Sequence, residues 1–159
     1  MMHDGIRDYW LRYLQRLPGR VYAILDAARG ARTTAPRDVL IPELPDVSPF
    51  VVAPTARELR ELVFAGWGNA WGIFATSTYS RDLVVAHAQQ LLHSQLASGE
   101  RVLFRFYDPR VLRAVAPACS SAERDELLGP FEHLVIEAHA PTAALDVTRE
   151  PPAAVGVAA

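Results

Sequence analysis

The chain has 159 residues, enough for one domain that buries roughly two-thirds of its unfolded surface. Its 50% hydrophobic and 21% charged residues are typical of a globular protein, and a net charge of -2 gives no indication of a nucleic-acid or anionic-membrane partner. A single cysteine excludes an internal disulfide framework, and neither a signal peptide nor a membrane-length apolar run is visible, so we expect a cytoplasmic protein.

Residues 1–20 are predicted to form an amphipathic helix. Aromatic and aliphatic residues recur three or four positions apart, as in Tyr9, Tyr13 and Leu17. Asp4 is the expected N-cap, and Pro18 with the glycine after it ends the pattern. Such a stripe favours packing on a core, with docking of a partner helix as the alternative.

Five apolar or alternating segments predict strands. They are residues 21–28, 47–53, 70–77, 100–107 and 132–138. In the fourth segment, alternation places Leu103, Arg105 and Tyr107 on one face, and the segment is expected to be covered on both sides. Residues 31–46, rich in Pro and Arg, are expected to form an exposed loop.

Local start signals predict the remaining helices. Thr55 and Ser120 each open a capping box, since a Glu follows three residues later. Ser80 is the expected cap of a longer helix. Asp108 precedes a proline, which suits an N-cap followed by Pro at the first helical position.

Helices between strands favour an α/β fold, with α+β as the alternative. We predict a single compact domain over residues 21–140, with a mixed or mainly parallel central sheet of about five strands flanked by helices. Residues 141–159 are dominated by Ala, Pro and Gly without periodicity, and are predicted to be a disordered tail.

The sequence indicates no cofactor or metal. A P-loop needs a lysine, which this chain lacks, and Gly66, Gly68 and Gly72 do not have the dinucleotide-binding spacing. His87 and His93 are six positions apart on a predicted helix, so they face different directions and cannot share one metal ion. We therefore expect neither a cofactor nor a metal site.

Two carboxylates offer the best case for catalysis. Asp26 and Asp108 both lie near predicted strand ends, where α/β proteins often place functional groups. Such a pair could hold a metal ion or serve as general acid and base. The alternative is structural, because Asp108 already suits a helix cap.

Arg105 needs a partner if its strand is covered on both faces, because an unpaired buried charge is costly. Asp26 and Asp108 are the expected partners, and the pair Asp26–Arg105 is the candidate structural ion pair. Arg110 and Arg113, three apart on the following helix, are expected to face solvent, with a partner contact as the alternative.

Several motifs occur in an order that resembles a known family. They are Tyr22-Ala-Ile-Leu-Asp26, Trp67-Gly68, Trp71-Gly72, Leu103-Phe-Arg-Phe-Tyr-Asp-Pro-Arg-Val-Leu112 and Gly129-Pro130-Phe131. Together they resemble the effector adaptors, or chaperones, of bacterial type VI secretion, known as Tap or Tec proteins. The resemblance covers roughly residues 21–135, and the long segment ending at Leu112 is its most specific part.

The resemblance implies a non-catalytic binding role. Such adaptors bind a cognate toxic effector in the cytoplasm and help load it onto the VgrG spike protein. The matching family-motif positions are Trp67, Trp71, Arg105, Tyr107, Asp108 and Arg110. They are the candidates for partner binding, with a role in the fold as the alternative for several of them. Many relatives carry a further C-terminal lobe, so we expect either a minimal adaptor or one whose missing lobe another chain supplies.

Two alternatives stay open beside the adaptor. One is an immunity or inhibitor protein that neutralises a toxin by binding it. The other is a metal-assisted enzyme that uses Asp26 and Asp108. We predict an adaptor, and therefore no enzyme activity, with protein partners and without nucleic-acid or membrane partners.

Overall fold

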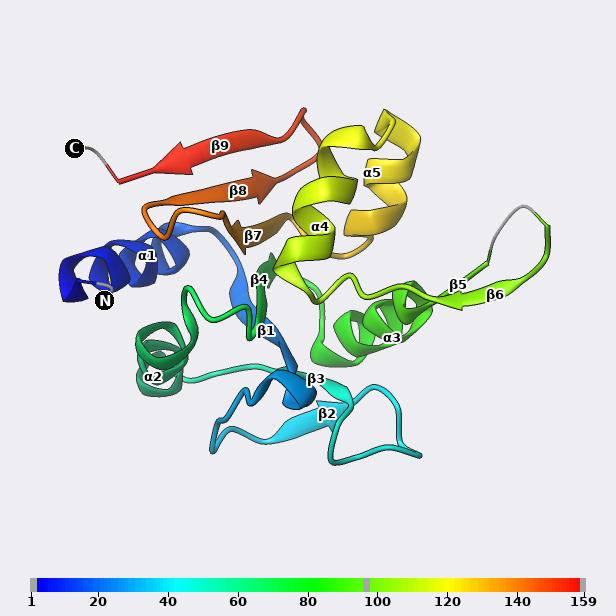
Figure 1. Cartoon of the computed structure of the whole chain (residues 1–159), viewed down its shortest axis with the longest axis horizontal. Helices are drawn as coiled ribbons and strands as arrows, with labels where there is room; N and C mark the ends of the chain where they lie inside the picture. The colour runs from blue at the N-terminus through cyan, green and yellow to red at the C-terminus, as the bar shows by residue number, and fades with distance from the viewer. Residues whose placement is uncertain (1–2, 96–97, 158–159) are drawn as a thin grey trace.

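A computed structural model describes residues 3–95 and 98–157 (Figure 1). The predicted first helix is confirmed as α1, Asp4–Arg16, and Leu17 is its C-cap. The side chain of His3, and not that of Asp4, accepts the capping hydrogen bond from the Gly5 N–H, so the predicted cap was one residue off. Residues 1 and 2, within the predicted 1–20 segment, lie outside the described residues.

Among the described residues, seven strands form one sheet in the order β2-β3-β1-β4-β7-β8-β9. Their bounds in chain order are β1 Arg20–Asp26, β2 Arg37–Val39, β3 Pro49–Val52, β4 Gly72–Ser77, β7 His133–Glu137, β8 Ala143–Val147 and β9 Ala153–Gly156. β2 lies within the segment predicted to be only a loop. A short 3-10 turn, η1 (Ala27–Arg29), follows β1.

The prediction of a mainly parallel sheet of about five strands was wrong, because every pairing in the described sheet is antiparallel. β3 and β4 do flank a helix and run in the same direction, as in a βαβ unit. However, β1 lies between them and pairs antiparallel with both. The intervening helix was therefore recognised correctly, whereas the identity of the neighbouring strand could not be read from element order.

The capping signals predicted for the other helices are confirmed. Thr55 caps α2 (Ala56–Gly66) and Ser120 caps α5 (Ser121–Leu128), each in a complete capping box. Ser80 caps α3 (Arg81–Leu92), and Asp108 caps α4 (Pro109–Val115), which continues as the 3-10 turn η2 (Ala116–Ala118). Each cap satisfies backbone N–H groups that a helix leaves without internal partners.

The sheet is covered on both faces, giving three layers. Figure 1 shows α1 and α2 on one side of the sheet, and α3, α4 and α5 on the other. Alternate residues of β1 enter the two cores: Tyr22 and Ile24 pack with the α3–α5 side, while Ala23 and Leu25 pack with the α1–α2 side. The prediction that helices flank the sheet is thus confirmed.

The strand predicted over residues 100–107 was wrong in length and place. Only β6, Arg101–Leu103, is a strand, and it pairs with β5, His93–Gln95, in a separate two-stranded hairpin. Figure 1 shows this hairpin projecting from the body of the protein. The aromatic residues that follow turn inward instead, and Phe106 is completely buried in the core.

The prediction that residues 141–159 form a disordered tail was also wrong, because β8 and β9 lie in this segment. β8 pairs with β7, and β9 pairs with β8. Contacts to α1 hold them, because the Tyr9 hydroxyl donates to the Gly156 carbonyl and the Tyr13 hydroxyl to Asp146. Residues 158 and 159 lie outside the described residues. Across residues 3–95 and 98–157, no helix combines the length and apolar character required to cross a membrane.

Candidate functional site: an arginine-lined cleft

Three chain segments meet at one end of the sheet. Because β1 and β4 are antiparallel, the last residues of β1 lie beside the start of β4, with Leu25 opposite Gly72. β7 is antiparallel to β4 and ends at the same edge with Glu137. The Asp26 N–H donates to the Trp71 carbonyl at 2.7 Å, which fixes the turn before β4 against the end of β1. The start of α4 completes this end of the molecule.

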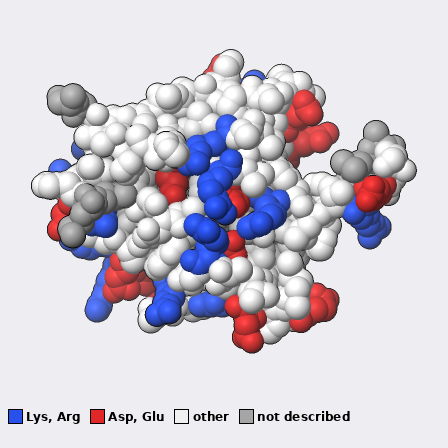
Figure 2. All heavy atoms as spheres, viewed as in Figure 1, with Lys and Arg blue, Asp and Glu red and all other residues white. Residues whose placement is uncertain are grey.

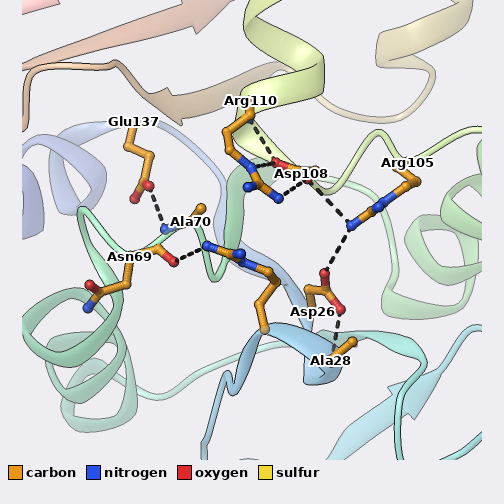
Figure 3. A network of polar contacts seen from close by, with 9 residues as sticks. Asp26, Ala28, Asn69, Ala70, Arg105, Asp108, Arg110 and Glu137 are labelled. Atoms are coloured by element: carbon orange, nitrogen blue, oxygen red, sulfur yellow. Dashed lines mark hydrogen bonds and ion pairs between the residues drawn. The ribbon is translucent and has the colours of Figure 1, made fainter.

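Two buried aspartates and two arginines form a network at this edge (Figure 3). Asp108 binds Arg110 through two side-chain hydrogen bonds, Nε to Oδ1 at 3.0 Å and Nη2 to Oδ2 at 2.8 Å. Arg105 lies between the carboxylates, its Nη2 3.7 Å from Asp26 and 3.6 Å from Asp108. These are the two partners expected from the sequence. Its predicted burial was wrong, since the Arg105 side chain is 49% exposed.

The two aspartates have opposite pKa shifts. Burial raises the pKa of Asp26 above its ordinary value, and the Ala28 N–H and Arg105 offset this only in part. Burial also acts to raise the pKa of Asp108, but the hydrogen bonds and charge of Arg110 outweigh it, so that pKa is lowered. Asp26 Oδ1 accepts from the Ala28 N–H, whereas its buried Oδ2 has no hydrogen-bond partner among the described residues.

Glu137 holds the turn between α2 and β4. Its carboxylate accepts hydrogen bonds from the Gly68 and Ala70 N–H groups, both at 2.7 Å. Ala70 has a positive φ of 54°, an uncommon conformation for a residue with a side chain, and its bond to Glu137 helps to stabilise it. Burial raises the pKa of Glu137, although the two N–H groups act in the opposite direction.

A cleft of about 780 Å³ opens beside these carboxylates. Its walls come from α1, η1, the turn after α2, α4 and the chain that leaves β7. The charged side chains that line it are Arg7, Arg29, Arg110, Arg113 and Glu137. Figure 2 shows basic side chains gathered in the middle of this face, around the start of α4, with acidic side chains among them.

Half of the six motif positions are buried in the protein. Trp67 is 2% exposed and stacks on Trp10, with 4.8 Å between ring centroids. Trp71 is half-buried, and its ring lies against Gly66, where an added Cβ would come within 2.7 Å of it. Tyr107 and Asp108 are buried as well. Of the six positions, Arg105 and Arg110 present the most exposed side chains, at 49% and 47%.

Sequence reasoning missed Arg29 and Glu137. Arg29 follows Asp26 in η1, and its Nη2 lies 3.5 Å from the Asn69 carbonyl. Glu137 ends an apolar strand at the same edge as Asp26, so the argument from strand ends applied to it equally. Arg113, expected to face solvent with a partner contact as the alternative, lines the cleft and donates to the Glu137 carbonyl at 3.0 Å.

The geometry offers binding groups more readily than a metal site. Within residues 3–95 and 98–157, no group of three or more His, Cys, Asp or Glu side chains is placed to hold a metal ion. The guanidinium groups in and beside the cleft suit carboxylate or phosphate oxygens, which they can bind with paired hydrogen bonds.

Fold and site thus define a three-layer protein with an antiparallel sheet and an arginine-lined cleft at one sheet end. The chain belongs to the family described as a domain of unknown function, DUF4123, which matches residues 37–126. That match includes the turn after α2 and all of α4. Searches of curated proteins and of solved structures give no match.

Proposed function

We propose that this protein is a non-catalytic adaptor that binds a type VI secretion effector in the cytoplasm and helps to load it onto the VgrG spike. The family membership carries the proposal, because the matched residues 37–126 lie within the stretch whose motifs resemble those adaptors. The motif segment from Leu103 to Leu112 falls entirely inside the match.

The contacts of the two aspartates support a binding role over a catalytic one. Asp108 caps α4 through the Arg110 N–H and also binds the Arg110 guanidinium. Asp26 caps η1 through the Ala28 N–H. Contacts within the fold thus occupy three of the four carboxylate oxygens, which supports a structural role for this pair over proton exchange with a substrate.

The accessible part of the site supports protein recognition. Arg105 and Arg110 project from a rigid junction, each with about half of its side chain exposed. Arginine is enriched in protein interfaces because its planar guanidinium can bind a carboxylate and stack on an aromatic ring. The open cleft beside the junction provides the concave surface that a protruding segment of a partner would need.

The test is co-purification from the native cell. The tagged full-length chain is isolated, and its partners are identified by mass spectrometry, with an unrelated tagged protein as control. We expect a toxic effector and a spike protein to be enriched. Recovery of neither partner would overturn the adaptor proposal.

Export assays distinguish the adaptor from an immunity protein. If the chain is an adaptor, deleting its gene should abolish effector secretion without harming the producing cell. If the deletion instead makes the effector toxic to its own cell while secretion continues, the protein acts in immunity and the adaptor proposal fails.

A further inference from the structure

Positive charge is concentrated in the cleft of a protein that is acidic as a whole. The full chain carries a net charge of -2. The cleft, however, is lined by four arginines and by Glu137 as its acidic residue. Both carboxylate oxygens of Glu137 are occupied by backbone N–H groups, and the four guanidinium groups outnumber this one carboxylate. The local potential of the cleft is therefore positive, which attracts anionic groups to this face.

Three of these arginines have donors directed to no acceptor in the described parts of the chain. Arg110 uses Nε and Nη2 on Asp108, which leaves its Nη1. Arg113 uses Nη1 on the Glu137 carbonyl, which leaves Nε and Nη2. Arg29 makes one long hydrogen bond, 3.5 Å, to the Asn69 carbonyl. These groups can each bind a further oxygen without breaking an existing contact.

Two of the cleft arginines, Arg110 and Arg113, are held in position before any ligand binds. Asp108, which is only 3% exposed, fixes the plane of Arg110 through its paired hydrogen bonds. The Glu137 carbonyl positions Arg113 from the opposite wall. Because these side chains have already lost rotamer freedom, a ligand that they bind incurs a smaller ordering cost.

We propose that this cleft binds an acidic peptide segment of the protein partner, whose carboxylates are received by Arg29, Arg110 and Arg113. This inference rests on the proposed function as an adaptor and names the chemistry of the segment that the adaptor holds. A cleft of about 780 Å³ is within the roughly 300–1,000 Å³ of ligand-binding clefts, so it accommodates a short stretch of chain.

A peptide fits this surface better than a nucleic acid. A nucleic acid presents an extended line of phosphates, which requires a broad basic surface, and the net charge of -2 opposes that. Here the basic groups are confined to a cleft with Trp67 and Ile6 in its walls. Side-chain carboxylates on a flexible segment can enter such a cleft, and guanidinium groups bind them with paired hydrogen bonds.

The first test measures binding of a fluorescein-labelled hexaglutamate peptide to the full chain by anisotropy, at about 50 mM salt to limit screening. Hexaglutamine serves as the uncharged probe. We expect binding of hexaglutamate only, weakened at least about tenfold in Arg29→Gln/Arg113→Gln, which removes charge-assisted hydrogen bonds. The matched control, Arg12→Gln/Arg57→Gln, removes two exposed helix-surface arginines and should change affinity less than about twofold.

Two results would overturn the inference. They are the absence of hexaglutamate binding and an equal loss of affinity in both double variants. Thermal melting checks that each variant is folded. If Arg113→Gln unfolds the protein, the single variant Arg29→Gln carries the test, because the long bond to the Asn69 carbonyl is the one hydrogen bond that its side chain makes within the described residues.

Co-purification separates this inference from the proposed function. If the wild-type chain captures an effector and Arg29→Gln/Arg113→Gln captures it equally well, the adaptor proposal stands and the cleft inference fails. If the wild-type chain captures neither effector nor spike, the adaptor proposal fails, and the peptide assay alone decides whether the cleft binds acidic segments.

Discussion

The turn from Trp67 to Trp71 and the junction from Arg105 to Arg110 use buried carboxylates in opposite ways. In the turn, Glu137 accepts from backbone N–H groups and Trp67 stacks inside the core. At the junction, Asp108 lies beneath arginines whose side chains are about half exposed. In the turn, the carboxylate binds backbone N–H groups and fixes the backbone conformation. At the junction, the carboxylate binds an arginine side chain that faces solvent.

The difference shows that motif positions of one family need not share one role. Substitution of Trp67 or Glu137 should act mainly on folding, since both side chains are buried and hydrogen-bonded to backbone groups of the protein. Substitution of the junction arginines should act on binding, since solvent reaches them and the fold needs them little. Measurements of stability and of binding on the same variants can therefore separate the two regions.

The largest effect is expected for Trp67→Ala. The ring is 2% exposed, stacks on Trp10 and donates its Nε1–H to the Pro141 carbonyl at 3.1 Å. Its removal leaves a cavity and takes away one of the two hydrogen bonds that the Pro141 carbonyl accepts, the other coming from Trp10 Nε1–H. The change should lower the free energy of unfolding by about 3–5 kcal/mol. Urea denaturation followed by circular dichroism measures this loss.

Arg105→Gln is the matched variant at the junction. Its guanidinium is 49% exposed and lies 3.6 to 3.7 Å from its two carboxylate partners, so the change should cost less than about 1 kcal/mol. Similar losses of stability in Trp67→Ala and Arg105→Gln would remove the distinction between the turn and the junction.

An intermediate effect is expected for Glu137→Ala, smaller than for Trp67→Ala and larger than for Arg105→Gln. The change leaves the Gly68 and Ala70 N–H groups without their acceptor, and Ala70 keeps a positive φ with less support. A loss of about 2 kcal/mol is expected, since water can reach the exposed Gly68 but not the buried Ala70. Glu137→Gln retains one acceptor oxygen and should lose about half as much in the same denaturation experiment. A fully stable Glu137→Ala would show that the turn holds its shape without the carboxylate.

Local signals predicted the helices well, because a cap acts within three or four residues. Thr55, Ser120 and Asp108 each bind an N–H group close in sequence, so the pattern alone identifies them. Strand neighbours depend on distant contacts instead. β9 forms where the sequence has little β character, since β8 pairs with it and Tyr9 binds the Gly156 carbonyl across 147 positions.

The site was predicted in part for the same reason. We predicted that Arg105 pairs with Asp26 and Asp108 because an unpaired buried charge is costly. The structure confirms this grouping, since the Arg105 guanidinium lies within 4 Å of both carboxylates. The cleft itself could not be predicted. It depends on Arg29 and Glu137 reaching one end of an antiparallel sheet, and the element order had suggested parallel strands.

The smallest effect, and the sharpest test of the junction, is expected for Asp26→Asn. The Oδ1 atom of the asparagine can still cap η1. The change removes a buried charge and its 3.7 Å contact to the half-exposed Arg105. The free energy of unfolding at neutral pH should therefore change by less than about 1 kcal/mol. Burial raises the folded-state pKa of Asp26 above its unfolded value, so the wild-type protein loses stability as the pH rises from the unfolded to the folded pKa. The difference in unfolding free energy between Asp26→Asn and wild type, measured by urea denaturation across the acidic range, should therefore shift in favour of the variant as pH rises. A shift in favour of the wild type would mean that Arg105 outweighs burial and that the junction is built on that ion pair.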